Sequence, residues 1–295
     1  MIFFSLCVVV LITVLYPHWA LAWGPVTHIV HGSEVFSHLT SLPAALQAIV
    51  GAHQNRYLYG CIGADIVQAK AYTRSLASHC HSWTVAWTLL RNARDDGQKA
   101  FAWGYMTHLA ADIVSHNHFV PTYLLRSFAS RTSGHAYWEA RADGLQRKRY
   151  WRTARRVLEN SYEDCDDLVE RSIDHTLFSF KTNKRIFDSL MGISKLEQWQ
   201  TMVNAVNRRS RYALTRSTVD RYNEACLRSV MDLLNNKRHS YTQNQDATGR
   251  EVLQRSTALR RRLRQLKRKR KLPPGTEHEV IRQMLEELPQ LIPPG

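Results

Sequence analysis

The sequence is poor in residues that break helices, and it lacks the pattern that builds sheets. Its 295 residues include only 13 Gly and 9 Pro, while 44% are hydrophobic. No segment alternates polar and apolar residues for long enough to predict a β-sheet. The composition excludes a low-complexity or disordered chain, and the length is sufficient for one large hydrophobic core.

Apolar residues recur instead at three- and four-residue spacing, which is the period of an amphipathic helix. Pro43 and the turn Asp95-Asp96-Gly97 separate some of these segments. The spacing predicts helices over Ser33–His38, Ala44–His53, Ser82–Ala93, Gln98–Ser115, His135–Leu158, Asp166–Phe178, Glu197–Ala213 and Val219–Leu234. We therefore expect an all-α fold, with a single helical domain over residues 23–236.

The first 22 residues contain no Lys or Arg, but they include an apolar run from Ile2 to Tyr16. This run is short for a bilayer span and is typical of the core of a signal peptide. The sequence Ala20-Leu21-Ala22 has the small-x-small form that signal peptidase cuts. We expect residues 1–22 to be a signal peptide, cleaved before Trp23, and the protein to be secreted or periplasmic. An uncleaved membrane anchor is the alternative.

Two kinds of reactive motif are missing. None of the five cysteines stands in CxxC spacing, so a cysteine-based zinc site is not predicted. No GxSxG elbow is present, which disfavours a covalent serine mechanism. The four cysteines after residue 22 could form two disulfides in an exported protein, and Cys61 with Cys80 is the first candidate pair.

The positive charge is unevenly distributed. The formal net charge is +15, and much of it lies in Leu259–Leu272, which reads LRRRLRQLKRKRKL. The preceding His239–Gly249 is polar and reads as a linker, and Glu277–Leu288 reads as an acidic–apolar helix. We expect residues 237–295 to be a linker and a basic helical tail outside the main domain. Such a segment fits an anionic membrane surface, a nucleic-acid backbone or a solvated charge run.

The placement of the 14 histidines is more informative than their number. His108 stands four residues before Asp112, and His135 stands four residues before Glu139. Each pair projects from one face of a helix, where an imidazole and a carboxylate can bind the same metal ion.

A single pair of this kind is more often a structural hydrogen bond than a metal site. Here two pairs lie within about thirty residues, and further candidate ligands stand on largely apolar segments. Because buried polar groups need partners, the clustering favours a multinuclear metal site. These further candidates are Trp23, His28, Asp65, His79, His81, His116 and His118.

The order of these residues resembles the zinc-dependent phospholipase C family, which in turn resembles the fungal single-strand nucleases with a trinuclear zinc fold. The His-x3-Asp-x5-His spacing that begins at His108 and the His-x3-Glu spacing that begins at His135 match without a gap. A mature N-terminal Trp, here Trp23, is the most unusual mark of the family. The resemblance covers roughly Trp23 to Asp143 and implies an all-α domain of the zinc-dependent phospholipase C type.

The resemblance also implies about three zinc ions with assigned ligands. The first set is His79, His108 and Asp112, with Asp65 close to it. The second set is His118, His135 and Glu139. The third set is the amine and carbonyl of Trp23 with His28 and Asp112, so that Asp112 bridges two ions.

Two of these ligand positions have a competing neighbour. A distance of 14 residues from the preceding candidate carboxylate favours His79 over His81. In the same way, the spacing from Asp112 favours His118 over His116.

The implied activity is that of a zinc-dependent phosphoric diester hydrolase, most directly a phospholipase C that cleaves phospholipid head groups. Zinc polarises phosphoryl oxygens and acidifies water, and Asp65 is the candidate to orient or deprotonate that water. The alternatives are a nuclease or nucleotidase of the same fold, which would bind nucleic acid, and a non-catalytic zinc-binding envelope protein. Aromatic residues near the candidate ligands fit a lipid or a base, and these are Trp83, Trp87, Trp103, Tyr105, Phe119, Tyr137 and Trp138.

Overall fold

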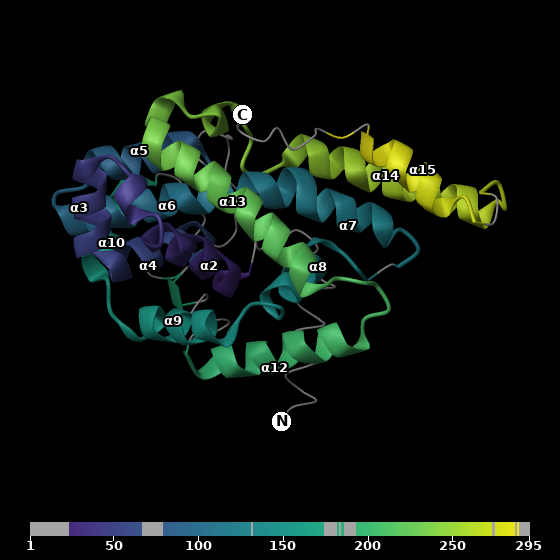
Figure 1. The fold of residues 1–295 in the computed structure, drawn as a ribbon, viewed down its shortest axis with the longest axis horizontal. Coiled ribbons are helices and arrows are strands. Elements are labelled where there is room, and N and C mark those ends of the chain that lie inside the picture. The colour runs from purple at the N-terminus through teal and green to yellow at the C-terminus, as the bar shows by residue number, and fades with distance from the viewer. Residues whose placement is uncertain are drawn as a thin grey trace.

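The computed structural model describes residues 24–66, 79–130, 132–173, 182, 184–185, 193–272, 275–286 and 288. The expected signal peptide and Trp23 lie outside these residues. Within them every regular element is a helix and none is a strand, which confirms the all-α prediction (Figure 1). None of these helices combines the length and the apolar character needed to cross a bilayer.

The α-helices of the described residues pack around two apolar clusters. They are α2 (Pro25–Phe36), α3 (Ala44–Ala52), α4 (Gln54–Ile66), α5 (Trp83–Asn92), α6 (Asp96–Val114), α7 (Val120–Arg126), α8 (His135–Asp143), α9 (Lys148–Glu159), α10 (Glu163–Ser172), α12 (Ile193–Arg209), α13 (Arg216–Asn236), α14 (Arg250–Arg268) and α15 (Glu277–Glu286).

The central helix is α6, which is buried along almost its whole length and packs most extensively against α4. Two glycines allow this close approach. A Cβ on Gly60 would lie 2.0 Å from the carbonyl oxygen of Phe101, and a Cβ on Gly104 would lie 1.9 Å from that of Tyr57. Since neither position has room for a side chain, the two backbones pack almost in contact. This packing brings the C-terminal end of α4 beside the middle of α6.

The expected long helix His135–Leu158 is in fact two helices. Gly144 follows the last residue of α8, and α9 begins at Lys148. The break allows the buried Asp143 to turn toward the start of α2, where Thr27 donates hydrogen bonds to Asp143 Oδ1 from its backbone N (2.8 Å) and its Oγ1 (2.7 Å). A carboxyl group at this place accepts hydrogen bonds from groups at the N-terminus of α2. Asp143 therefore ties α8 to α2.

The helix over Gln98–Ser115 was expected to end before Pro121. Instead, α6 continues through a π-helical turn at Ser115–Phe119 into α7. Proline is tolerated there because it stands at the start of α7, where its missing N–H costs little. Isolated π-helical turns of this kind frequently mark functional sites.

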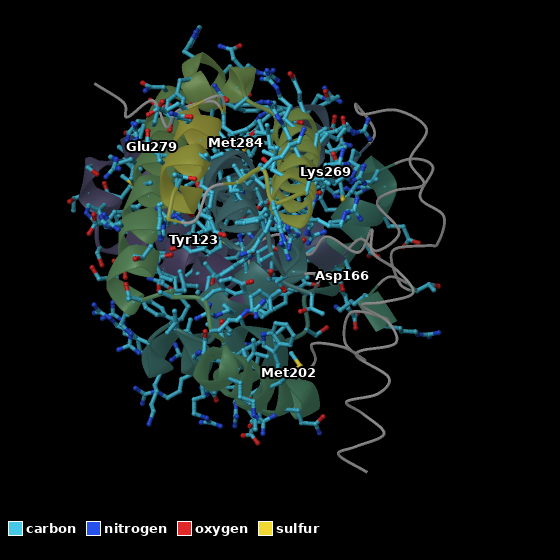
Figure 2. The ribbon with its side chains drawn as sticks, turned by 90° about the vertical axis from the view of Figure 1, so that its right-hand side faces the viewer. Tyr123, Asp166, Met202, Lys269, Glu279 and Met284 are labelled. Carbon is cyan, nitrogen blue, oxygen red and sulfur yellow. The ribbon has the colours of Figure 1, made fainter. Side chains whose placement is uncertain are left out.

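The C-terminal region is packed against the rest of the molecule rather than appended to it, which corrects the prediction of a separate tail. In Figure 1, α14 and α15 both lie along α7, and each contacts it. Figure 2 views this end of the molecule and labels Glu279 and Met284 on α15. The three helices enclose a second apolar cluster made of Leu125, Phe128, Val252, Leu263, Ile281, Met284 and Leu288.

One arginine of the basic run belongs to this packing. Arg260 is 8% exposed and donates to the carbonyl oxygens of Ser130 and Ser133, at 2.8 Å each. Among the described residues, the candidate partners Cys61 and Cys80, like Cys165 and Cys226, are buried and form no disulfide with one another.

Candidate metal centre

Three imidazoles surround the carboxylate of Asp112, which lies on α6 and is fully buried. Asp112 Oδ1 lies 3.4 Å from His28 Nε2, and Oδ2 lies 3.2 Å from His81 Nε2 and 3.1 Å from His108 Nε2. These histidines come from α2, the turn before α5, and α6 respectively. Asp112, predicted to bridge two ions, thus lies within 3.4 Å of three imidazole nitrogens.

Asp65, near the end of α4, faces the same three imidazoles. Its carboxylate oxygens lie 3.9 Å from His28 Nε2, 3.6 Å from His81 Nε2 and 3.9 Å from His108 Nε2. The rings of His28 and His108 are stacked, with centroids 3.8 Å apart. Two carboxylates therefore share one set of nitrogens, and we name these five residues the aspartate group.

A second set, the glutamate group, consists of His116, His135 and Glu139. Glu139 Oε1 lies 2.7 Å from His135 Nε2 and 3.6 Å from His116 Nε2. The His135 side chain is 18% exposed, whereas those of its two partners are at most 5% exposed. Solvent therefore reaches the centre on the His135 side.

Burial dominates the protonation of both groups in the absence of metal. It lowers the pKa of His28 well below its ordinary value, and nearby His108 adds to the effect. Burial raises the pKa of Glu139 to about 8. Burial by itself would raise the pKa of Asp112, but the fields of His108 and His116 hold that pKa well below its usual range. At neutral pH the Glu139 carboxyl is therefore mostly protonated, and binding a cation there releases its proton.

Several buried nitrogen and oxygen atoms of the two groups, each able to bind a metal ion, have no hydrogen-bond partner among the described residues. They include both ring nitrogens of His28, Nε2 of His116 and Oε2 of Glu139. Because buried polar atoms are otherwise nearly always paired, their clustering indicates a missing ligand. In the sets His28–Asp65–His108, His81–His108–Asp112 and His116–His135–Glu139 the candidate donor atoms lie within 4.8 Å of one another.

The chemistry of these donors suits zinc. Imidazole nitrogens and carboxylate oxygens without thiolates are typical of catalytic zinc sites. His108 Nδ1 lies 2.8 Å from the carbonyl oxygen of Cys61, and His116 Nδ1 lies 2.6 Å from that of Ala247. Partners of this kind orient a metal-binding imidazole and direct its other nitrogen to the ion. The residues present therefore fit a zinc centre.

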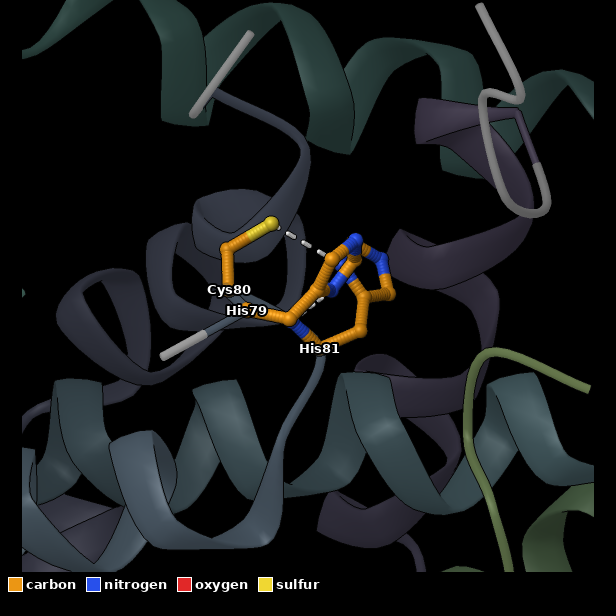
Figure 3. A group of neighbouring side chains, drawn as sticks. All are labelled: His79, Cys80 and His81. Atoms are coloured by element: carbon orange, nitrogen blue, oxygen red, sulfur yellow. Dashed lines mark hydrogen bonds between the residues drawn. The ribbon is translucent and has the colours of Figure 1, made fainter. Parts of the chain in front are cut away.

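The structure brings His81, and not the preferred His79, to the two aspartates. Residues 79–82 form a turn, closed by a hydrogen bond from Ser82 N to His79 O (2.9 Å). His79 Nδ1 accepts a hydrogen bond from His81 N (3.0 Å), and Cys80 Sγ lies 3.2 Å from His81 Nδ1 (Figure 3). His79 thus stabilises the turn that directs His81 inward, although His79, Cys80 and His81 also lie close enough together to share an ion.

The glutamate group departs from the prediction in a similar way, because His116 and not His118 lies beside Glu139. The spacing from Asp112 favoured His118, and the helix was expected to end at Ser115, but the helix continues. On a continuing helix the residue four positions after Asp112 stays on its face, and the residue six positions after it does not. The spacing to His116 was the signal that sequence reasoning undervalued.

The fold and the ligand atoms define a helical protein with buried histidine–carboxylate groups that could hold metal. The family described as zinc dependent phospholipase C matches residues 27–186, which is more than half of the chain, and the chain belongs to this family. Its members are hydrolases. Neither the curated proteins nor the solved structures contain a match to the chain.

Proposed function

We propose that the protein is a zinc-dependent phosphodiester hydrolase, and specifically a phospholipase C that removes head groups from phospholipids. The observation that carries the proposal is the pair of adjacent buried groups with unsatisfied donor atoms, accessible beside His135. Membership of the family supports the same chemistry.

Asp65 is assigned the role of general base. Zinc ions, when bound here, polarise phosphoryl oxygens and make water more acidic. Asp65 lies within 4 Å of three imidazoles and is 3% exposed, so its carboxylate is held in a fixed, nearly dry position. From there it orients the attacking water and takes its proton. Asp112, between three imidazoles, serves as the shared carboxylate.

Three partly exposed aromatic residues are the candidates for substrate contact. Trp103, Tyr105, Phe119 and Trp138 are buried core residues and cannot line a substrate site. The remaining three are Trp83, Trp87 and Tyr137. Aromatic faces of this kind fit a quaternary ammonium head group or an acyl chain.

The proposal includes export and processing. Cleavage after Ala22 frees the amine of Trp23, and that amine and the Trp23 carbonyl complete the ligands around His28. A secreted or periplasmic enzyme meets lipid at a membrane surface. Exposed cationic side chains on and just after α14 fit an anionic surface of that kind, and they include Arg261, Arg262, Arg268, Lys269, Arg270 and Lys271.

The test compares two substrates with one preparation of protein that begins at Trp23. A short-chain phosphatidylcholine and single-stranded DNA are assayed with zinc present and after its removal by a chelator. We expect zinc-dependent release of phosphocholine. Cleavage of DNA alone would identify a nuclease, and hydrolysis of neither substrate by zinc-loaded protein would identify a non-catalytic zinc-binding protein.

A further inference from the structure

The polar segment between α13 and α14, expected to be a linker, runs over the glutamate group. The carbonyl oxygen of Ala247 lies 2.6 Å from His116 Nδ1. The next carbonyl toward the N-terminus, that of Asp246, accepts a hydrogen bond from Asn117 Nδ2 (3.0 Å). About 130 residues of chain separate each pair of partners. Both acceptors belong to the backbone, so the contact depends on the path of the chain rather than on a side chain.

Gly249 permits this path. Its φ is +55°, a conformation that favours glycine, and a Cβ there would lie 2.4 Å from His116 Cβ and 2.7 Å from His116 O. Gly249 also stands immediately before α14, whose first residue is Arg250. The start of α14 is therefore packed directly against the backbone and Cβ of His116.

The segment is fixed on both sides of Ala247. The indole of Trp83 donates to the carbonyl oxygen of Gln245 (3.1 Å), and the indole of Trp87 donates to Gln243 Oε1 (2.7 Å). On the other side, Asp246 accepts hydrogen bonds from the backbone N of Thr248 (2.9 Å) and of Arg250 (3.0 Å). These bonds hold the carbonyl of Ala247 in place.

The contact determines which nitrogen of His116 carries hydrogen. A carbonyl oxygen can only accept, so Nδ1 must be the donor. In the neutral ring, Nε2 then has a free lone pair, and it is this atom that lies 3.6 Å from Glu139 Oε1 and has no hydrogen bond among the described residues. The fixed tautomer is the one needed to bind an ion at Nε2.

We infer that residues 243–250, here named the histidine clamp, are a positioning element of the metal centre. The clamp sets the tautomer and orientation of His116, so the site of the glutamate group is complete only when the C-terminal region is folded against it. The family match ends at residue 186, so the clamp lies beyond the matched region. The inference rests on the proposed zinc centre for its consequence, but the tautomer itself is independent of zinc.

The test uses a matched pair of glycine variants of the full mature chain. Gly249→Ala places a methyl group against His116, whereas Gly275→Ala places one at φ +82° with no atom within 4 Å. Zinc content and zinc affinity are measured by elemental analysis and by competition with a chelator, and helix content by circular dichroism. We expect Gly249→Ala to bind one zinc ion about 10- to 100-fold more weakly, and Gly275→Ala to behave as wild type.

Wild-type affinity in Gly249→Ala, or equal losses in both variants, would overturn the inference. A second measurement covers the case in which Gly249→Ala fails to fold or wild type binds no zinc. The ¹⁵N shifts of the His116 ring, assigned by comparison with His116→Gln, report the tautomer in metal-free wild type. Protonation at Nδ1 supports the clamp, and protonation at Nε2 refutes it, whatever the fate of the proposed function.

Discussion

At the scale of single residues, the centre depends most on Asp112, whose two oxygens face three imidazoles at 3.1 to 3.4 Å. Asp112→Asn keeps the shape of the side chain but removes the charge that a bridging ligand supplies to two ions. We expect this variant to lose more than one zinc ion while its helices remain. Elemental analysis with circular dichroism checks this, and loss of a single ion or of none would remove the bridging role.

Asp65 yields a different prediction, because its proposed role is to orient and deprotonate the attacking water rather than to hold the ions. Asp65→Asn should retain most of the zinc, yet phospholipid hydrolysis should fall by about 10²- to 10⁴-fold, since a general base contributes a factor of this size. Steady-state kinetics and zinc analysis on the same sample separate the two effects. Turnover near that of wild type would exclude Asp65 as the base.

Helix periodicity was sufficient to place His108 and Asp112 on one face of a helix, whereas the family resemblance grouped His28 and Asp65 with them. Neither was sufficient for His81 or His116. The first depends on the hydrogen bonds of a short turn, and the second depends on whether a helix continues past residue 115. The turn and the continuation of the helix are both local backbone conformations, and the pattern of apolar residues does not predict either of them.

At the scale of helices, Asp143 links α8 to α2 and makes stability depend on pH. Burial raises the pKa of Asp143 from 3.8 to about 6. The folded state therefore binds this proton more tightly than the unfolded state, so the stabilising contribution is complete below about pH 4 and is lost as pH rises through about 6.

Replacing Asp143 by Asn removes the group that titrates. The unfolding free energy of wild type minus that of Asp143→Asn should fall by about 2.4 kcal/mol between pH 4 and pH 7, at 1.36 kcal/mol per unit of pKa. Urea unfolding of both proteins in a chelator measures it, and groups common to both cancel. Asp96→Asn is the control, because the neighbouring Lys99 lowers the pKa of the exposed Asp96. A difference that does not change with pH, or that rises, would contradict the assignment.

The helices themselves were largely predictable from periodicity, and their assembly at the C-terminal end was not. The apolar residues of α14 are few and are separated by arginines, so the segment reads as a charged tail. In the structure those residues meet α7 and α15, and Arg260 donates to carbonyl groups in the segment between α7 and α8. The polar segment before α14 read as a linker because its contacts with the centre are made mainly by backbone carbonyls.

At the scale of the whole molecule, the cationic surface on α14 is predicted to bind anionic membranes. Arg261→Gln/Arg262→Gln removes two exposed charges and leaves the buried Arg260 intact. Binding to phosphatidylserine-containing vesicles should weaken by roughly 30-fold, at about 1 kcal/mol per charge, and the effect should shrink at high salt.

The matched control is Arg208→Gln/Arg209→Gln, which removes the same charge from exposed positions at the end of α12. Vesicle sedimentation at low and high salt compares the two variants. Equal weakening in both would mean that only the net charge matters, and the surface on α14 would lose its special role.

The central claim, a zinc centre of several ions that includes the processed N-terminus, is tested most directly by counting zinc. Elemental analysis is applied to protein released by a protease so that it begins at Trp23, and to the same protein with one extra residue before Trp23. We expect about three ions per chain in the first and about two in the second, because an amide nitrogen is a poor ligand. One ion or none in the protein that begins at Trp23 would contradict the claim.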